Sequence, residues 1–200
     1  MSTLEAQRAF WDWFGHNEPA FRDLDVPDKD ERLDALLEAL QDHCAGLWFE
    51  TGRADDGCNE LIVSAEGDPR YFSAARLLVA AAPQIDGWRF IAFKPACGFS
   101  FTTNYEGIVL DPATAWFIPL HPAGDTSPYA IRVAYAHYDP SRADAFRAGT
   151  FIMLECALGE VAFAEAFQHV EVGALPSSPE SNGFLPVTEL TAFLDHHSAT

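Results

Sequence analysis

The sequence predicts an α+β fold, built as a single domain over 1–200 with a mostly antiparallel sheet of about five to seven strands and helices packed mainly on one face. Three observations lead to this expectation. Residues 60–95 have the order of a strand, a sharp turn, a helix and a second strand. Residues 129–138 alternate between two sets of side chains, as a strand does. No internal repeat or low-complexity linker divides the chain.

Two helices are expected before the first strand. Apolar residues at helical spacing predict a helix that ends near Gly15. A second series of this kind ends near Gly46, a residue that suits a helix stop. Asp28, Asp30 and Glu31 crowd the start of this second helix, where carboxylates favour the positive end of the helix dipole. The apolar residues of the first helix are Leu4, Phe10, Trp11 and Phe14.

The next part of the chain predicts a strand pair, a helix and a third strand. Residues 47–51 and 60–64 read as paired strands joined by a glycine-rich loop. Asp68 is a suitable N-cap, and Pro69 is suited to the first helical position. Residues 88–93 are mostly apolar on both faces, so we expect a central strand covered on two sides.

The second half of the chain continues with mixed elements. Residues 107–111 and 115–120 are expected to form a hairpin. Residues 139–158 are apolar nearly all round and predict the most buried helix. Toward the end we expect an edge strand near 169–172, a loop over 174–186, a closing helix from 187 to 194 and a frayed tail over 196–200.

The net charge of −18 is the strongest anomaly in the composition. Residues 1–68 hold 17 acids and 5 bases, so the imbalance is concentrated at the front of the chain. Binding to DNA, RNA or an anionic membrane needs Lys and Arg to neutralise phosphate, so we expect neither nucleic acid nor a membrane as a partner. The acids predict either a basic protein partner steered by the field or simply solubility.

The reactive residue types show no motif for a cofactor or a metal. The four cysteines lie far apart without a Cys-x-x-Cys pair, and the histidines lack a metal-ligand spacing. We therefore expect no cofactor, no metal and reduced thiols. The first residues lack a basic flank followed by an apolar run, so no signal peptide is expected and the cytoplasm is the predicted location.

Several short motifs resemble those of a group of bacterial proteins of unknown function. They are Trp-Asp-Trp-Phe at 11–14, Phe-Glu at 49–50, Ser-Ala-Glu-Gly-Asp at 64–68, the segment 82–95 and Leu-Gly-Glu at 158–160. The resemblance covers most of the chain and implies a bacterial cytoplasmic setting. It implies no activity and brings no catalytic residues with it.

Two functional hypotheses follow from the sequence. The first is a non-enzymatic accessory or protein-interaction module, of an immunity-like kind, that presents an acidic surface with aromatic anchors to a basic partner. Its residues are Trp11, Trp13, Phe14, Asp28, Asp30 and Glu31. The oligomeric state is left open.

The second hypothesis is a small hydrolase or metal-dependent enzyme that uses clustered carboxylates. Its candidate catalytic residues are Glu50, Glu66, Asp68 and Glu160, which all lie at expected element ends, with Arg89 and Lys94 as counter-charges. A structural alternative applies to the same residues. Asp68 can cap a helix, while the glutamates can brace turns and helix ends through ion pairs.

Overall fold

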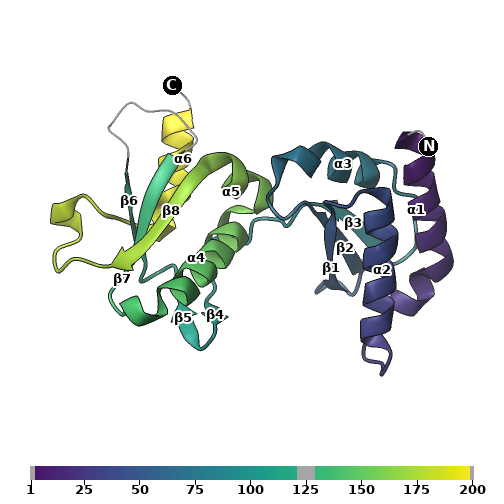
Figure 1. Ribbon diagram of the computed structural model, residues 1–200, viewed down its shortest axis with the longest axis horizontal. Coiled ribbons are helices and arrows are strands. Elements are labelled where there is room, and N and C mark those ends of the chain that lie inside the picture. Colours follow the sequence, from purple (N-terminus) through teal and green to yellow (C-terminus); the bar gives the residue numbers. More distant parts are fainter. Residues whose placement is uncertain (1–2, 121–128, 199–200) are drawn as a thin grey trace. The chain divides into compact units, whose positions relative to one another are not determined.

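The computed structural model describes residues 3–120 and 129–198, and over these ranges the fold is α+β with six α-helices and nine strands (Figure 1). The strands form three sheets of three, two and four strands, each smaller than the expected sheet of five to seven. The contacts between residues divide the chain into two compact units, 1–94 and 95–200. The strand patterns predicted the class correctly, but they do not reveal which strands share a sheet.

The N-terminal unit holds three α-helices and a three-stranded sheet. In chain order its elements are α1 (Thr3–Asn17), the 3-10 turn η1 (Glu18–Phe21), α2 (Lys29–His43), β1 (Trp48–Arg53), β2 (Asn59–Ser64), α3 (Pro69–Ala80) and β3 (Trp88–Ala92). The strand order is β1-β2-β3, with β1 antiparallel and β3 parallel to β2. The expected pairing of the first two strands is therefore confirmed, while β3 is an edge strand and not a central one.

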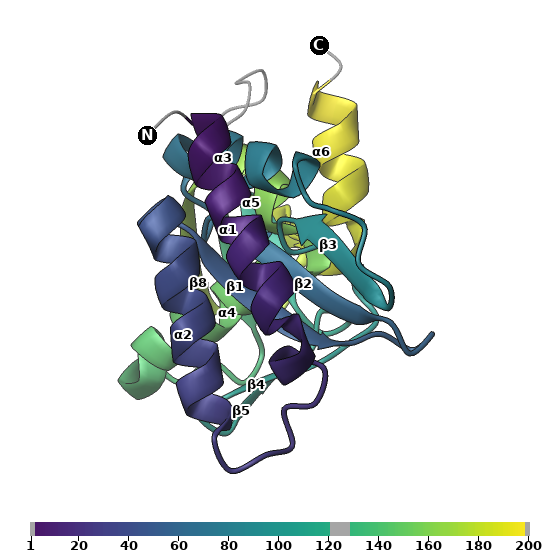
Figure 2. The same cartoon turned by 90° about the vertical axis from the view of Figure 1, so that its right-hand side faces the viewer.

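All three helices of this unit lie on one face of its sheet (Figure 2). Leu61 and Phe90 are register partners on the covered face, where the ring of Trp11 lies 4.6 Å from that of Phe90. The indole Nε1 of Trp11 donates a hydrogen bond of 2.8 Å to the carbonyl oxygen of Leu78 in α3. The core thus consists of one helix layer on one sheet layer, with Leu36 and Leu40 of α2 fully buried.

The C-terminal unit combines a small hairpin, a four-stranded sheet and three α-helices. Its elements are β4 (Thr103–Tyr105), β5 (Ile108–Leu110), β6 (Trp116–Pro119), β7 (Tyr129–Tyr135), η2 (Pro140–Arg142), α4 (Ala143–Leu158), α5 (Glu160–Ala166), β8 (Phe167–Ala174), η3 (Glu180–Asn182), β9 (Leu185–Pro186), η4 (Val187–Glu189) and α6 (Leu190–Ser198). The sheet order is β8-β7-β6-β9, and only β7 and β8 run parallel. Each unit therefore contains an antiparallel strand pair, then a helical crossover to a parallel strand.

The expected hairpin of 107–111 with 115–120 is wrong. β5 pairs with β4 in a separate two-stranded sheet, while β6 joins β7 and β9. The hairpin of β4 and β5 packs against α4 at Gly149, where an added Cβ would lie against Leu110 and Tyr105. The turn residues between β5 and β6 could not predict this packing, because it depends on contact with α4, about forty residues later in the chain.

Helix α4 is the core helix that the sequence predicts. Met153 and Leu154 are fully buried, and the hydroxyl of Thr150 lies 2.9 Å from the Tyr135 hydroxyl in β7. The segment 174–186 lacks long regular elements, although it contains η3 and the two residues of β9. Residues 196–198 belong to α6, and the rest of the expected frayed tail lies outside the described residues.

Candidate functional site

Two of the four candidate carboxylates lie together in the N-terminal unit. Lys94 Nζ lies 2.9 Å from Glu66 Oε1 and 3.8 Å from Glu50 Oε1, and only 15% of the lysine side chain is exposed. Glu66 adopts a positive φ of 50° in the turn after β2, and its backbone N–H donates to the Ser64 hydroxyl at 2.9 Å. The lysine therefore ties the edge strand β1 to this turn.

Asp68 has the capping role that the sequence predicts. Its Oδ1 accepts a hydrogen bond of 3.0 Å from the backbone N–H of Arg70, at the start of α3. The Arg70 side chain bonds the same carboxylate, and these contacts lower the pKa of Asp68 below its ordinary value. A carboxylate held in its ionised form by a cap and an arginine is suited to holding a helix start.

Glu160 is the first residue of α5 and is fully buried in the C-terminal unit. Arg89, which was expected as a counter-charge for the candidate carboxylates, forms ion pairs with two other acids. Its Nη2 lies 2.6 Å from Asp56 Oδ2 and its Nη1 lies 2.6 Å from Glu60 Oε1. Within residues 3–120 and 129–198, no group of three or more His, Cys, Asp or Glu residues is arranged to hold a metal ion. The observed contacts favour bracing roles for Glu50, Glu66 and Asp68.

The aromatic anchors expected on the partner surface are mostly buried. Trp11 is 4% exposed and Phe14 is 0% exposed, and both rings contact Phe90 of β3. Their place in the core requires a correction to the expected surface, since buried rings cannot reach a partner without unfolding the unit. Helical spacing alone could not separate a core stripe from an exposed one. Trp13 is only partly buried.

A groove lies between the antiparallel helices α1 and α2, on the surface of the N-terminal unit. It has a volume of about 250 Å³. Three small residues, Ala6, Ala9 and Ala39, leave this space open, and Phe10 and Trp13 add aromatic wall. Asp42 and His43 line it from the last turn of α2. Figure 2 shows the two helices side by side over the sheet. The groove can accept an aliphatic chain that ends in a positive charge.

An acidic ladder runs along α2 beside this groove. It consists of Asp30, Asp34, Glu38 and Asp42, which are all exposed and follow one another at intervals of four residues. No ion pair joins these four to any Lys or Arg in the part of the chain that the structure describes. Residues four apart face the same side of a helix, so these carboxylates repel one another.

Of the three acids predicted at the start of α2, one pairs with an arginine and two lie exposed in the first turn. Asp28 precedes the helix and accepts a hydrogen bond of 2.9 Å from Arg32 Nε, which lowers the pKa of the Asp28 carboxyl. Asp30 and Glu31 lie exposed in the first turn. The sequence prediction missed Asp34, Glu38 and Asp42, although their four-residue spacing was a signal that could have identified them.

Burial governs the titration of the histidine in the groove. It lowers the pKa of the His43 imidazole from its ordinary value of 6.5, and a contact with the Ala6 backbone offsets part of this effect. His43 is therefore neutral at pH 7. A neutral ring beside Asp42 keeps the groove attractive to cations.

Comparison with known proteins gives no relative. No protein-family model matches the chain, and neither curated proteins nor solved structures provide a match. The bacterial resemblance of the short motifs stays a prediction. Among the helices of the described ranges, none combines the length and apolar character needed to cross a membrane.

Proposed function

We propose that this protein is a non-enzymatic accessory or interaction module, immunity-like in kind, which binds a basic protein partner through α1 and α2. The contact surface consists of the acidic ladder and the adjacent groove. The aromatic contact in this surface is Trp13, because the rings of Trp11 and Phe14 are buried.

The observation that carries the proposal is the ladder itself. Like charges four residues apart destabilise a helix by roughly 0.2–0.5 kcal/mol a pair. A row of such pairs beside an open groove lowers the stability of the free protein and becomes favourable when cations of a partner approach. The neighbouring Asp28, in contrast, has its own arginine at 2.9 Å.

The groove supplies the specific part of the proposed contact. An arginine or lysine side chain of the partner would lay its apolar stem over Ala6, Ala9 and Ala39. Its charged end would then reach Asp42 and the ring of Trp13, which offer an ion pair and a cation–π contact. The carboxylate-enzyme alternative has less support, because the contacts of Glu50 and Glu66 with Lys94 already account for those side chains.

A hexa-arginine peptide tests the proposal by titration, with NMR shifts mapping the contact on the full chain. Asp42→Asn is expected to weaken binding by up to about fivefold, as is usual for an exposed ion pair. Ala9→Leu fills the groove and is expected to weaken binding without a change of charge. Glu180→Gln in the C-terminal unit is the matched control for charge and is expected to have a much smaller effect. Equal losses in Asp42→Asn and Glu180→Gln, or shifts outside α1 and α2, would contradict the proposal.

A further inference from the structure

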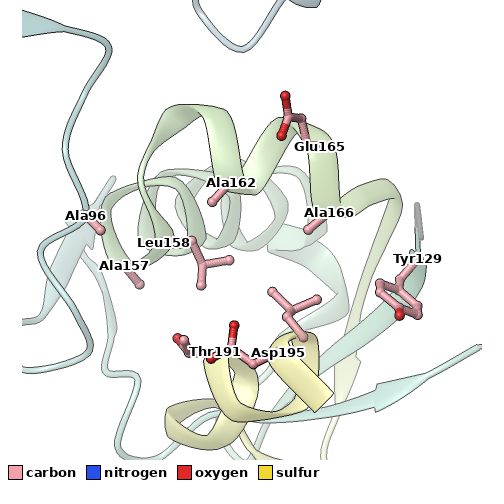
Figure 3. A pocket seen from close by; sticks show the side chains of 10 residues that line it. Ala96, Tyr129, Ala157, Leu158, Ala162, Glu165, Ala166, Thr191 and Asp195 are labelled. Carbon is pink, nitrogen blue, oxygen red and sulfur yellow. The ribbon is translucent and has the colours of Figure 1, made fainter. Parts of the chain in front are cut away.

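The C-terminal unit contains a cavity of about 380 Å³ between the end of α4, α5 and α6 (Figure 3). The segment before β4 closes one side. The backbone N–H of Cys97 donates a hydrogen bond of 2.8 Å to the carbonyl oxygen of Cys156. The N–H of Gly98 donates one of 3.1 Å to the carbonyl oxygen of Ala157. These bonds satisfy two of the last carbonyl groups of α4 and hold Ala96 at the cavity wall. The cavity is therefore formed by hydrogen-bonded backbone and helices, which give it a defined shape.

One wall of the cavity is apolar and made mostly of small side chains. Ala157 and Leu158 come from the end of α4, while Ala162 and Ala166 come from α5. Alanines one turn apart on α5 leave a channel where larger side chains would fill the space. In Figure 3 this wall faces α6 across the open volume. Such a wall favours an alkyl chain, since each buried methylene contributes about 0.8 kcal/mol, or roughly fourfold in affinity.

The opposite wall carries the polar groups. Thr191 and Asp195 lie one turn apart on α6 and point toward the end of α4, whereas the Glu165 carboxylate turns away from α6 (Figure 3). Both residues are exposed, and the phenol of Tyr129 is a further polar group among the lining residues. A carboxylate beside a hydroxyl is an acceptor pair for a group with several N–H donors.

The charge of this region has one sign. Among the described residues that line the cavity, none is a lysine or arginine. The sequence from residue 148 to 200 contains seven Asp and Glu and no Lys or Arg. A negative cavity repels carboxylates and phosphates and attracts cations.

We propose that this cavity binds a primary alkylammonium group. The alkyl chain lies along Ala157, Ala162 and Ala166, while the ammonium donates hydrogen bonds to the Asp195 carboxylate and the Thr191 hydroxyl. A free aliphatic amine and a lysine side chain share this chemistry. The site lies in the C-terminal unit and does not depend on the function proposed for α1 and α2.

The test uses the full chain and three six-carbon probes, namely hexylamine, hexanol and hexanoate, followed by NMR and calorimetry. Hexylamine is expected to bind with shifts at α5 and α6, hexanol to bind at least tenfold more weakly, and hexanoate not to bind. Shortening the amine from six to four carbons is expected to weaken binding roughly fifteenfold, from two lost methylenes. Nα-acetyl-lysine methylamide forms a second arm. Tighter binding of this probe than of butylamine assigns the group to a lysine side chain, and weaker binding assigns it to a free amine.

Variants separate the cavity from general attraction by charge. Asp195→Asn is expected to weaken hexylamine binding by up to about fivefold, as is usual for an ion pair at an exposed carboxylate. Glu189→Gln makes the same change of charge on an exposed residue outside the cavity and is the matched control. Ala162→Leu keeps the charge, fills the channel and is expected to weaken hexylamine more than butylamine. The proposal is overturned by equal effects of Asp195→Asn and Glu189→Gln, by binding that survives Ala162→Leu unchanged, or by hexanol binding as well as hexylamine.

Discussion

At the scale of single residues, burial decides what a side chain does. Trp11 and Trp13 are two positions apart, yet one is 4% exposed and hydrogen-bonded to Leu78, while the other lines a surface groove. Tyr135 is likewise buried, and burial raises the pKa of its hydroxyl to about 12, partly offset by the hydrogen bond with Thr150. Tryptophan and tyrosine combine an apolar ring with one polar group wherever they occur. Whether such a residue belongs to the core or to a contact surface is therefore decided by its burial.

His43 provides a test at this scale. Its pKa is lower in the folded protein than in the unfolded chain, because burial disfavours the charged ring. Above pH 6.5 both states are neutral, so this contribution to stability is fully present there and is lost as the pH falls through the folded pKa. His43→Leu is expected to flatten the decline in the free energy of unfolding between pH 7 and 5, measured by urea denaturation.

The exposed histidine of α1 is the control for that measurement. His16→Gln removes an exposed ring from α1 and measures what the loss of a surface histidine alone does to the pH dependence. The same slope in the His43→Leu and parent proteins would show that the buried ring does not govern stability in this range.

At the scale of elements, α2 combines two faces with opposite demands. Leu36 and Leu40 anchor it on the sheet, while the acidic ladder occupies its solvent side. Stability alone favours alternating charges at four-residue intervals, because opposite charges attract across one helical turn. The ladder has only one sign of charge, which is the reason for assigning it a binding role.

Asp34→Gln is the element-scale prediction. It removes the like-charge pairs of Asp34 with Asp30 and with Glu38, so the free energy of unfolding is expected to rise by about 0.4–1 kcal/mol at low salt. The gain is expected to shrink as salt is added, because exposed charges are screened. Thermal and urea denaturation at two ionic strengths measure both effects. A loss of stability would mean that Asp34 has a favourable partner and that the ladder is not self-repelling.

At the scale of the whole molecule, both units are acidic in different ways. The N-terminal unit has 18 acids and 9 bases, and the C-terminal unit has 12 acids and 3 bases. In both units most bases are used in local ion pairs, such as those of Arg89 and Lys94 in the first unit and those of Arg132 and Arg147 in the second. The long-range field attracts cations to both units, while local pairing determines which acids remain available.

Association kinetics test this distinction. Replacing Asp30, Glu31 and Glu38 by their amides is expected to slow association with the hexa-arginine peptide and to flatten its salt dependence, measured by stopped-flow fluorescence. Glu106, Glu180 and Glu189 changed in the same way give an equal loss of charge in the C-terminal unit. If both triple variants slow association equally, overall charge and not the ladder controls the rate. Thermal denaturation of each variant verifies that the fold is retained.

The α+β class can be predicted from the sequence alone, as can the strand pair β1 and β2, the capped start of α3 and the buried helix α4. These features depend on neighbours within one or two turns, where spacing and capping residues act directly. The sequence also identified the acids at the start of α2. The folded structure was needed to show that the strands divide into three sheets, that Trp11 and Phe14 lie in the core and that Lys94 joins Glu50 to Glu66. Each of these outcomes depends on contacts between residues far apart in the chain, and packing, not local pattern, selects among the pairings that a sequence allows.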